Sequence, residues 1–228
     1  MSAGFPRNAD ASAATLATLP PALRQSLFIT GTDTAVGKTW AAVRLLQAWA
    51  RSGHRAAGMK PVAAGATLTP EGPRNDDALA LLAAANVPIP YALCNPLCLP
   101  RPTSPHLAAR EAGIDINLDL IARPFHTIAS QSDLIAVEGA GGWLTPLTPT
   151  LTMADLAIRL NLPILLVIGI RLGCLNHALL TAQAITGTGL KLAAWLPTPI
   201  DPHFPDHDAY VETLTQRLPA PRVHLPHF

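Results

Sequence analysis

Short apolar runs alternate with segments of helical spacing along most of the chain. The apolar runs predict buried strands at residues 26–30, 56–61, 133–138, 163–168 and 191–196, and a short sixth strand near Val223. Apolar positions recur with a helical period over residues 38–52, 76–85, 118–130, 153–160, 175–186 and 207–217. Near-continuous apolar strands separated by helices are typical of a parallel sheet that helices cover on both faces. The pattern therefore predicts a single doubly wound, mainly parallel α/β domain that binds ligands at the carboxyl ends of its strands.

Composition changes at the start of the chain and in its connections. Residues 1–25 are rich in Ala, Ser, Pro and Thr and show no period, so we expect a disordered extension before a domain at 26–228. The 23 prolines concentrate at residues 88–105, 146–149 and 197–205. We expect these segments to form long surface loops over one edge of the sheet.

Composition and charge exclude several functions. Hydrophobic residues make up 49% of the chain and charged residues 14%, which indicates a packed globular protein. The net charge of +1, without a clustered basic tract, gives no support for nucleic acid or an anionic membrane surface as a partner. No apolar run reaches the roughly 18–20 residues that span a bilayer, and no signal-peptide pattern is visible. Three cysteines at irregular spacing argue against disulfides, and we interpret Cys94 and Cys98 as ordinary thiols of a cytoplasmic protein.

A phosphate-binding loop is the strongest chemical signal. The first strand runs into the sequence GTDTAVGKT at 31–39, in which Gly37, Lys38 and Thr39 open a helix. Backbone N–H groups at a helix N-terminus attract phosphate oxygens, a lysine there reaches the outer phosphates, and a threonine hydroxyl can bind Mg²⁺. Five residues, rather than the usual four, separate Gly31 from Gly37. An ordinary glycine turn is the alternative, but the position between a strand and a long helix predicts nucleotide binding.

Two further strand ends carry charged residues. Lys60 leaves the second strand, where it is either a solvated surface charge or a cation for a transferring phosphoryl group. Asp76 and Asp77 lie at a predicted helix start, and either could cap that helix. Glu138 ends the third strand, before the glycine-rich segment 139–142, where it is either a second Mg²⁺ ligand or a capping residue.

Several motifs in order resemble the dethiobiotin synthetase family of P-loop enzymes. They lie at residues 31–39, 60–63, 70–79, 102–106, 137–143 and 171–177, and the likeness runs from Ser26 to Pro221. The resemblance implies an Mg²⁺- and nucleoside-triphosphate-dependent cyclo-ligase of biotin biosynthesis. CO2 adds to one amine of 7,8-diaminopelargonic acid, and the carbamate attacks the terminal phosphate to give a mixed carbamic–phosphoric anhydride. The second amine then closes the ureido ring of dethiobiotin and releases phosphate, leaving ADP when ATP is used.

The resemblance also implies roles for individual residues. The implied catalytic residues are Thr34, Lys38 and Lys60, and the implied Mg²⁺ ligands are Thr39, Asp77 and Glu138. The implied nucleotide contacts are Ala35, Val36, Gly37, Lys38, Thr39, Trp40, Asp77, Glu138, Gly139, Ala140, Gly141, Thr198, Pro199, Leu225, Pro226 and His227. The implied substrate contacts are Thr34, Lys60, Ala64, Gly141, Gly142, Leu175, Asn176 and Tyr210. The last three would come from a second subunit, so the resemblance implies a homodimer with its substrate site at the interface.

The chain differs from the family pattern at a few positions. Ala35 replaces an acidic residue of the loop, and Ala64 replaces a serine that contacts the substrate. Thr198 and Pro199 stand where related enzymes often have an Asn-Asp pair that reads adenine. The sequence ends at Phe228, where we expect a segment that helps to cover the base to be missing. The preferred nucleotide, ATP or another triphosphate, therefore stays open.

Three other functions remain as alternatives. A partitioning-type ATPase switch of the same structural class usually has a lysine early in the loop, where this chain has Asp33. A non-catalytic homologue would not need all of the implied reacting residues. A related ligase would act on another diamine or carboxylate. Nucleotide turnover separates them, because the switch hydrolyses nucleotide without diamine, the binding protein turns over nothing, and the synthetase needs diamine and CO2 together.

Overall fold

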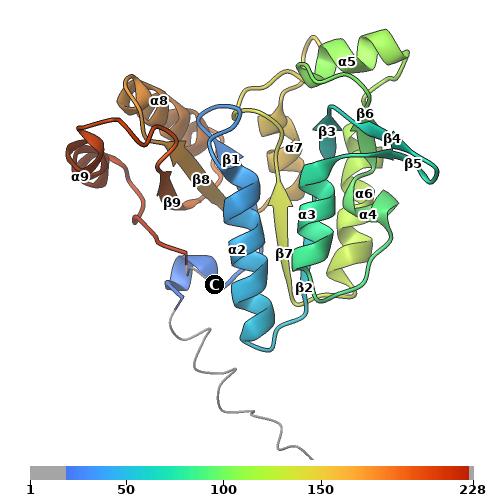
Figure 1. Ribbon diagram of the computed structural model, residues 1–228, viewed down its shortest axis with the longest axis horizontal. Helices are drawn as coiled ribbons and strands as arrows, with labels where there is room; N and C mark the ends of the chain where they lie inside the picture. Colours follow the sequence, from blue (N-terminus) through green and yellow to red (C-terminus); the bar gives the residue numbers. More distant parts are fainter. Residues whose placement is uncertain (1–18, 226–228) are drawn as a thin grey trace, which may run out of the picture.

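A single parallel sheet forms the centre of the computed structural model, which describes residues 19–225 (Figure 1). Its strand order is β2-β7-β1-β8-β9, and every neighbouring pair is parallel. The strands are β1 (Leu27–Gly31), β2 (Ala56–Met59), β7 (Leu134–Glu138), β8 (Ile164–Gly169) and β9 (Leu192–Thr198). Every residue of β1, β7 and β8 is buried, which explains why these strands are continuous apolar runs in the sequence. The predicted parallel α/β fold is confirmed.

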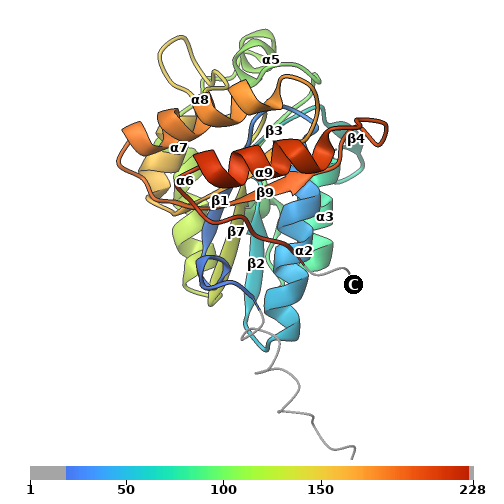
Figure 2. The same ribbon diagram turned by 90° about the vertical axis from the view of Figure 1, so that its left-hand side faces the viewer.

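Helices cover both faces of this sheet (Figure 1). Six of them are α2 (Lys38–Arg51), α3 (Asp76–Ala84), α6 (Leu118–Ala129), α7 (Met153–Leu160), α8 (Cys174–Gly187) and α9 (His207–Arg217). Helices α2 and α3 pack together on one face, and α6 and α7 pack together on the other. Helix α8 lies on β8 and β9, and Figure 2 shows α9 beside it. All six were predicted with boundary errors of at most one residue.

The structure contains short elements that the sequence analysis did not predict. Strands β3 (Val62–Ala64) and β6 (Leu97–Leu99) pair in parallel, and β4 (Thr67–Thr69) and β5 (Gly72–Arg74) form an antiparallel hairpin. Two further helices are α4 (Tyr91–Cys94), which lies within the expected loop at 88–105, and α5 (Pro105–Ala112), which begins where that loop was expected to end. Near Val223 the expected sixth strand is reduced to one parallel bridge between Trp195 and Arg222. The β3–β6 pair, the β4–β5 hairpin and α5 lie at the carboxyl end of the sheet, on the side of β2 and β7 (Figure 1).

The expectation of disorder through residue 25 is wrong for residues 19–25. Pro21–Leu23 forms a 3-10 helix, η1, and the side chains of Leu19 and Leu23 are buried in the core. The indole Nε1 of Trp49 donates a hydrogen bond of 2.7 Å to the carbonyl of Leu23. The folded domain therefore includes these residues, whereas residues 1–18 of the predicted extension lie outside the described part of the chain.

Two sequence expectations concern compartment rather than fold. Within residues 19–225, none of the helices is both long enough and apolar enough to cross a bilayer. Cys94, Cys98 and Cys174 are free thiols, and Cys94 and Cys174 are buried.

Candidate active site

The loop after β1 has the backbone shape of an anion-binding site. Gly37 caps the N-terminus of α2 with φ = 92°, a left-handed backbone conformation that residues other than glycine rarely adopt. A Cβ atom at Gly37 would also lie 3.1 Å from the Thr198 side chain. No side chain caps α2, so its first N–H groups are available to phosphate oxygens.

Lys38 lies in the first turn of α2 and is almost fully buried. Its ammonium donates a hydrogen bond of 2.8 Å to the carbonyl of Asp33, within the same loop. Burial, together with repulsion from Lys60, lowers the pKa of Lys38 from 10.5 to about 8. An incoming polyphosphate would give this ammonium an anionic partner.

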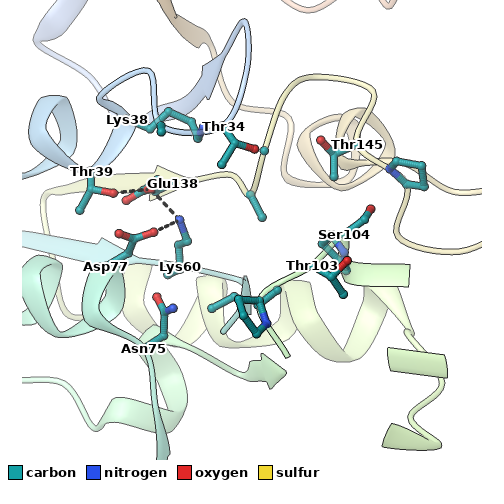
Figure 3. Close-up of a pocket in the computed structure, with 18 of the residues that line it drawn as sticks. Thr34, Lys38, Thr39, Lys60, Asn75, Asp77, Thr103, Ser104, Glu138 and Thr145 are labelled. Atoms are coloured by element: carbon teal, nitrogen blue, oxygen red, sulfur yellow. Dashed lines mark hydrogen bonds and ion pairs between the residues drawn. The ribbon is translucent and has the colours of Figure 1, made fainter. Parts of the chain in front are cut away.

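Lys60 is held between two carboxylates at the carboxyl end of the sheet (Figure 3). Its Nζ lies 2.6 Å from Oε1 of Glu138 and 2.8 Å from Oδ2 of Asp77. The Thr39 hydroxyl donates to the same Glu138 oxygen over 2.8 Å. Burial alone would lower the pKa of Lys60, but Glu138 and Asp77 outweigh it, so the pKa is raised and the ammonium stays charged. Burial raises the pKa of Glu138, and the Lys60 ammonium opposes that shift.

These residues converge because two strands end and two helices begin at one edge of the sheet. Lys60 follows β2 and Glu138 ends β7, whereas Thr39 and Asp77 lie in the first turns of α2 and α3. The Asn75 side chain accepts a hydrogen bond from the Ala78 N–H and thus caps α3. Capping therefore falls to Asn75, and the Asp77 carboxylate is free to contact Lys60.

One cavity of about 780 Å³ joins eleven of the 23 residues to which the sequence assigned a site role. The predicted residues that line it are Thr34, Ala35, Gly37, Lys38, Thr39, Lys60, Ala64, Asp77, Glu138, Ala140 and Gly141. Sequence reasoning gave no role to Asn75, Thr103, Ser104 and Thr145, which also line the cavity (Figure 3). The motifs at 70–79 and 102–106 include Asn75, Thr103 and Ser104, whereas Thr145 lies outside every motif and reaches the cavity only through tertiary folding.

Other predicted nucleotide contacts lie around this cavity rather than in it. Val36 is buried in the core, Gly139 packs against Phe28, and Trp40 is partly exposed on α2. The Thr198 hydroxyl donates to the carbonyls of Val36 (2.6 Å) and Ile168 (3.2 Å). It therefore holds the phosphate loop against β8.

The structure describes only some of the predicted nucleotide contacts near the end of the chain. Pro199 directly follows β9, and Leu225 is buried. Pro226 and His227 lie outside the described residues.

The predicted substrate contacts are split between two places. Gly142 lines a second hollow of about 360 Å³, together with Leu144 and Leu180. Leu175 and Asn176 lie in the first turn of α8, and Tyr210 lies on α9 with its ring 4.8 Å from that of Phe204. These three residues do not line the cavity of their own subunit.

The oxygen atoms near Lys60 fit a hard divalent cation. Thr39, Asp77 and Glu138 supply one hydroxyl and two carboxylates, the ligand chemistry that Mg²⁺ prefers. Oε2 of Glu138 is buried without a hydrogen-bond partner, so it is an acceptor that a cation would satisfy. Within residues 19–225, no group of three or more His, Cys, Asp or Glu residues is placed to hold a metal. Such a sparse protein shell is typical of Mg²⁺ that is bound largely through water and phosphate.

Fold and site together define a P-loop nucleotide-binding protein. A family model described as an AAA domain matches residues 25–196. The ParA family ATPase from Chlorobium tepidum TLS superposes with a TM-score of 0.51 at 13% identity, covering 89% of this chain and 86% of that one. The signal recognition particle receptor FtsY from Elizabethkingia anophelis gives 0.51 at 13% identity, covering 96% and 68%. At such low identity these likenesses establish the fold alone.

Sequence relatives narrow the class to one family. The ATP-dependent dethiobiotin synthetase BioD 1 of Escherichia coli O157:H7 is 48% identical over 194 residues, or 85% of this chain and 86% of that one. The ATP-dependent dethiobiotin synthetase BioD of Xanthomonas axonopodis pv. citri (strain 306) is 47% identical over 196 residues, or 86% and 88%. The chain belongs to the ATP-dependent dethiobiotin synthetase family, as the motifs predicted. The interpretation as a partitioning-type switch is not favoured, because the likeness to ParA is one of fold only.

Proposed function

We propose that this protein converts 7,8-diaminopelargonic acid, CO2 and a nucleoside triphosphate, with Mg²⁺, into dethiobiotin, nucleoside diphosphate and phosphate. The observation that carries the proposal is the second buried cation of the cavity. A nucleotide-binding module needs Lys38 and the N-terminus of α2, but it does not need Lys60 held by Glu138 and Asp77 on the same cavity. A second cation there suits a reaction in which an anionic substrate attacks the terminal phosphate.

Each residue of the site then has a chemical role. The N–H groups of α2 and the Lys38 ammonium bind the outer phosphates. Lys60 neutralises the carbamate and the transferring phosphoryl group, and Thr34 binds the carbamate side of the substrate. Thr39, Asp77 and Glu138 would hold Mg²⁺, which when bound offsets charge on the phosphate oxygens. Positioning and charge neutralisation supply most of the rate enhancement, because phosphoryl transfer needs little covalent help from a protein.

The reaction balances with these groups alone. The carbamate oxygen forms a bond to the terminal phosphorus as the bond to the nucleoside diphosphate breaks. The second amine then attacks the carbamoyl carbon, loses a proton, and expels phosphate as the ring closes. Because the cavity of about 780 Å³ also includes Thr103, Ser104 and Thr145, it has room and polar groups for a diamine beside the phosphates.

The test is phosphate release with Mg²⁺, bicarbonate and 7,8-diaminopelargonic acid, run in parallel with ATP, CTP and GTP. We expect release that depends on the diamine, with dethiobiotin formed in equal amount. Release without the diamine, or none with any nucleotide, would contradict the synthetase assignment. The three rates also test nucleotide choice. We expect weak discrimination, because Thr198 is engaged by backbone carbonyls and Pro199 has no N–H to donate to a base.

A homodimer is part of the same proposal. Leu144, Leu172 and Leu180 are large apolar side chains with 62%, 77% and 56% of their surface exposed. Leu144 and Leu180 border the hollow at Gly142, beside the active-site cavity. A second subunit on this face would bury them and bring the first turn of α8 and Tyr210 toward the substrate. Light scattering should therefore give about twice the chain mass of 24.0 kDa, and the monomer mass would contradict this arrangement.

Nucleotide affinity should fall above pH 8. Below the Lys38 pKa of about 8 the ammonium is already charged, so affinity is constant there. Above it, binding of the polyphosphate must first restore the proton, and affinity should weaken by up to about tenfold per pH unit. Titration calorimetry at pH 9 in buffers of different ionisation enthalpy should detect the uptake of about one proton, and none at pH 7. A constant affinity up to pH 10 would show that Lys38 does not meet the phosphates.

A further inference from the structure

The backbone of Lys60 is held from outside the main sheet. Strand β2 is an edge strand that ends at Met59, so the sheet does not continue through Lys60. The Lys60 N–H donates to the carbonyl of Cys94 (2.8 Å), and the Lys60 carbonyl accepts from Nδ2 of Asn95 (2.7 Å). Two successive residues at the end of α4 therefore bind both backbone polar groups of Lys60.

The Tyr91 hydroxyl links this contact to α3. It donates to Oδ1 of Asn95 (2.8 Å) and accepts the N–H of Asn75 (2.8 Å), with Sγ of Cys98 3.5 Å away. Asn75 is the N-cap of α3, and the first turn of that helix carries Asp77. The contacts form a closed ring that runs from the Lys60 ammonium through Asp77, the α3 cap, Tyr91 and Asn95, back to the Lys60 carbonyl.

Both linking side chains have their polar atoms fully engaged. The Asn95 side chain is 3% exposed, and its Nδ2 also donates to the carbonyl of Leu97 (3.2 Å). Burial raises the pKa of the Tyr91 phenol, which therefore remains a donor. The Arg74 guanidinium lies over the Tyr91 ring, 4.2 Å from its centre. Lys60, Asn75 and Asn95 are buried and Tyr91 is half-buried. A satisfied network of such groups favours one geometry and resists displacement.

We propose that Tyr91 and Asn95 are positioning residues for phosphoryl transfer, which act by fixing the Lys60 ammonium relative to Asp77. Neither residue lines the cavity, so neither touches a substrate. The inference rests on the proposed function, since it assigns the ring to the residues that would neutralise the transferring phosphate. It also separates nucleotide binding from turnover, because Lys38 and the N-terminus of α2 are not part of the ring.

Tyr91→Phe is the sharpest test, since it removes one oxygen and leaves the Asn75 N–H and Asn95 Oδ1 unpaired. We expect kcat to fall by about tenfold or more, since small displacements of reacting groups are costly, while KM for ATP changes by less than about twofold. Asn95→Ala should act in the same way. The kcat of the double variant should be no lower than that of the more impaired single variant, because both substitutions break the same ring.

Asn86→Ala is the matched control. Asn86 holds the opposite end of β2, where Oδ1 accepts the Ala56 N–H (2.7 Å) and Nδ2 donates to the His54 carbonyl (2.8 Å). The Asn86→Ala substitution removes the same kind of contact far from the cavity, so it should lower the melting temperature and leave kcat unchanged. If Tyr91→Phe also lowers only the melting temperature, Tyr91 is merely structural and the proposal is overturned.

A readout independent of turnover comes from the lysines. The sequence has only three lysines, Lys38, Lys60 and Lys191. Protein that is isotope-labelled at lysine Cε and Nζ therefore gives few NMR signals. We expect Tyr91→Phe to shift the Lys60 signal and Asn86→Ala to leave it in place. A wild type without diamine-dependent turnover, but with this selective shift, would reject the proposed function and keep the positioning role. An unmoved Lys60 signal would overturn the positioning role whatever the activity.

Discussion

Replacing Lys60 with methionine is expected to lower kcat by about a thousandfold, the scale on which a single cation acts in phosphoryl transfer. Methionine is unbranched and one atom shorter, so it replaces most of the apolar stem and removes the ammonium with its charge and its three donors. The Lys60 ammonium lies 2.6 Å from Glu138 and 2.8 Å from Asp77, on a cavity that Lys38 also lines. Without it, the two carboxylates would repel an anionic carbamate. Nucleotide binding should survive, since Lys38 and the α2 N-terminus remain.

The measurement is diamine-dependent phosphate release, with the Kd for ATP measured beside it. Lys191→Met is the control, because Lys191 is exposed at the far end of β9 and should retain wild-type activity. The substitution at Lys60 also leaves Glu138 buried without its cation, which costs roughly 3–5 kcal/mol in comparable buried pairs. Circular dichroism must therefore show a folded variant. A folded Lys60→Met protein with normal kcat would remove Lys60 from the mechanism.

The main sheet could be predicted from the sequence because its strands are buried on both faces. Strands β1, β7 and β8 contain no exposed position, so each reads as an unbroken apolar run. Helix α7 was predicted correctly at both ends from its apolar period, and its start is set locally, because hydrogen bonds between Thr152 and Asp155 close a capping box there. Local signals were sufficient for elements whose boundaries are set by local chemistry.

The missed elements lack such signals. Helix α4 is only four residues long and begins after Pro90, and α5 begins at Pro105, at the end of a proline-rich segment with no clear period. Leu19 and Leu23 are isolated apolar residues in a polar and proline-rich stretch, and only their contact with the core shows that they are buried. Tertiary packing determines the structure of these segments, and the local sequence pattern does not predict that packing.

The residues of the site fall into the same two groups, those that a local sequence signal predicted and those that only the fold reveals. Lys38, Lys60 and Glu138 were predicted because each follows or ends a strand, and the carboxyl ends of parallel strands meet at one edge. Tyr91 and Asn95 were missed because they act through hydrogen bonds to residues that are distant in the sequence. The Thr198 hydroxyl, implied by resemblance to meet the nucleotide, donates to backbone carbonyls of the phosphate loop and β8, and no sequence signal indicated these partners. Side-chain partners of this kind require the fold.

Glu138→Gln is the second substitution with a large expected effect. Glu138 accepts hydrogen bonds from Thr39 and Lys60 through Oε1, and its Oε2 is buried without a partner. Glutamine keeps the shape and one acceptor but removes the negative charge that a divalent cation needs. We expect the Mg²⁺ concentration for half-maximal turnover to rise by about tenfold to a hundredfold. We also expect kcat to fall by about a hundredfold at saturating Mg²⁺.

Titration of turnover with Mg²⁺ measures both effects, and Glu71→Gln provides the control. Glu71 is exposed at the β4–β5 turn and accepts a hydrogen bond only from Thr69 among the described residues, so its charge should not influence the site. If Glu138→Gln lowers kcat without changing the Mg²⁺ requirement, Glu138 serves only as the counter-ion of Lys60. If both change while Lys60→Met alters kcat alone, the two residues have separate roles. Glu138 then holds the metal while Lys60 neutralises the carbamate, although one short contact joins them in this structure.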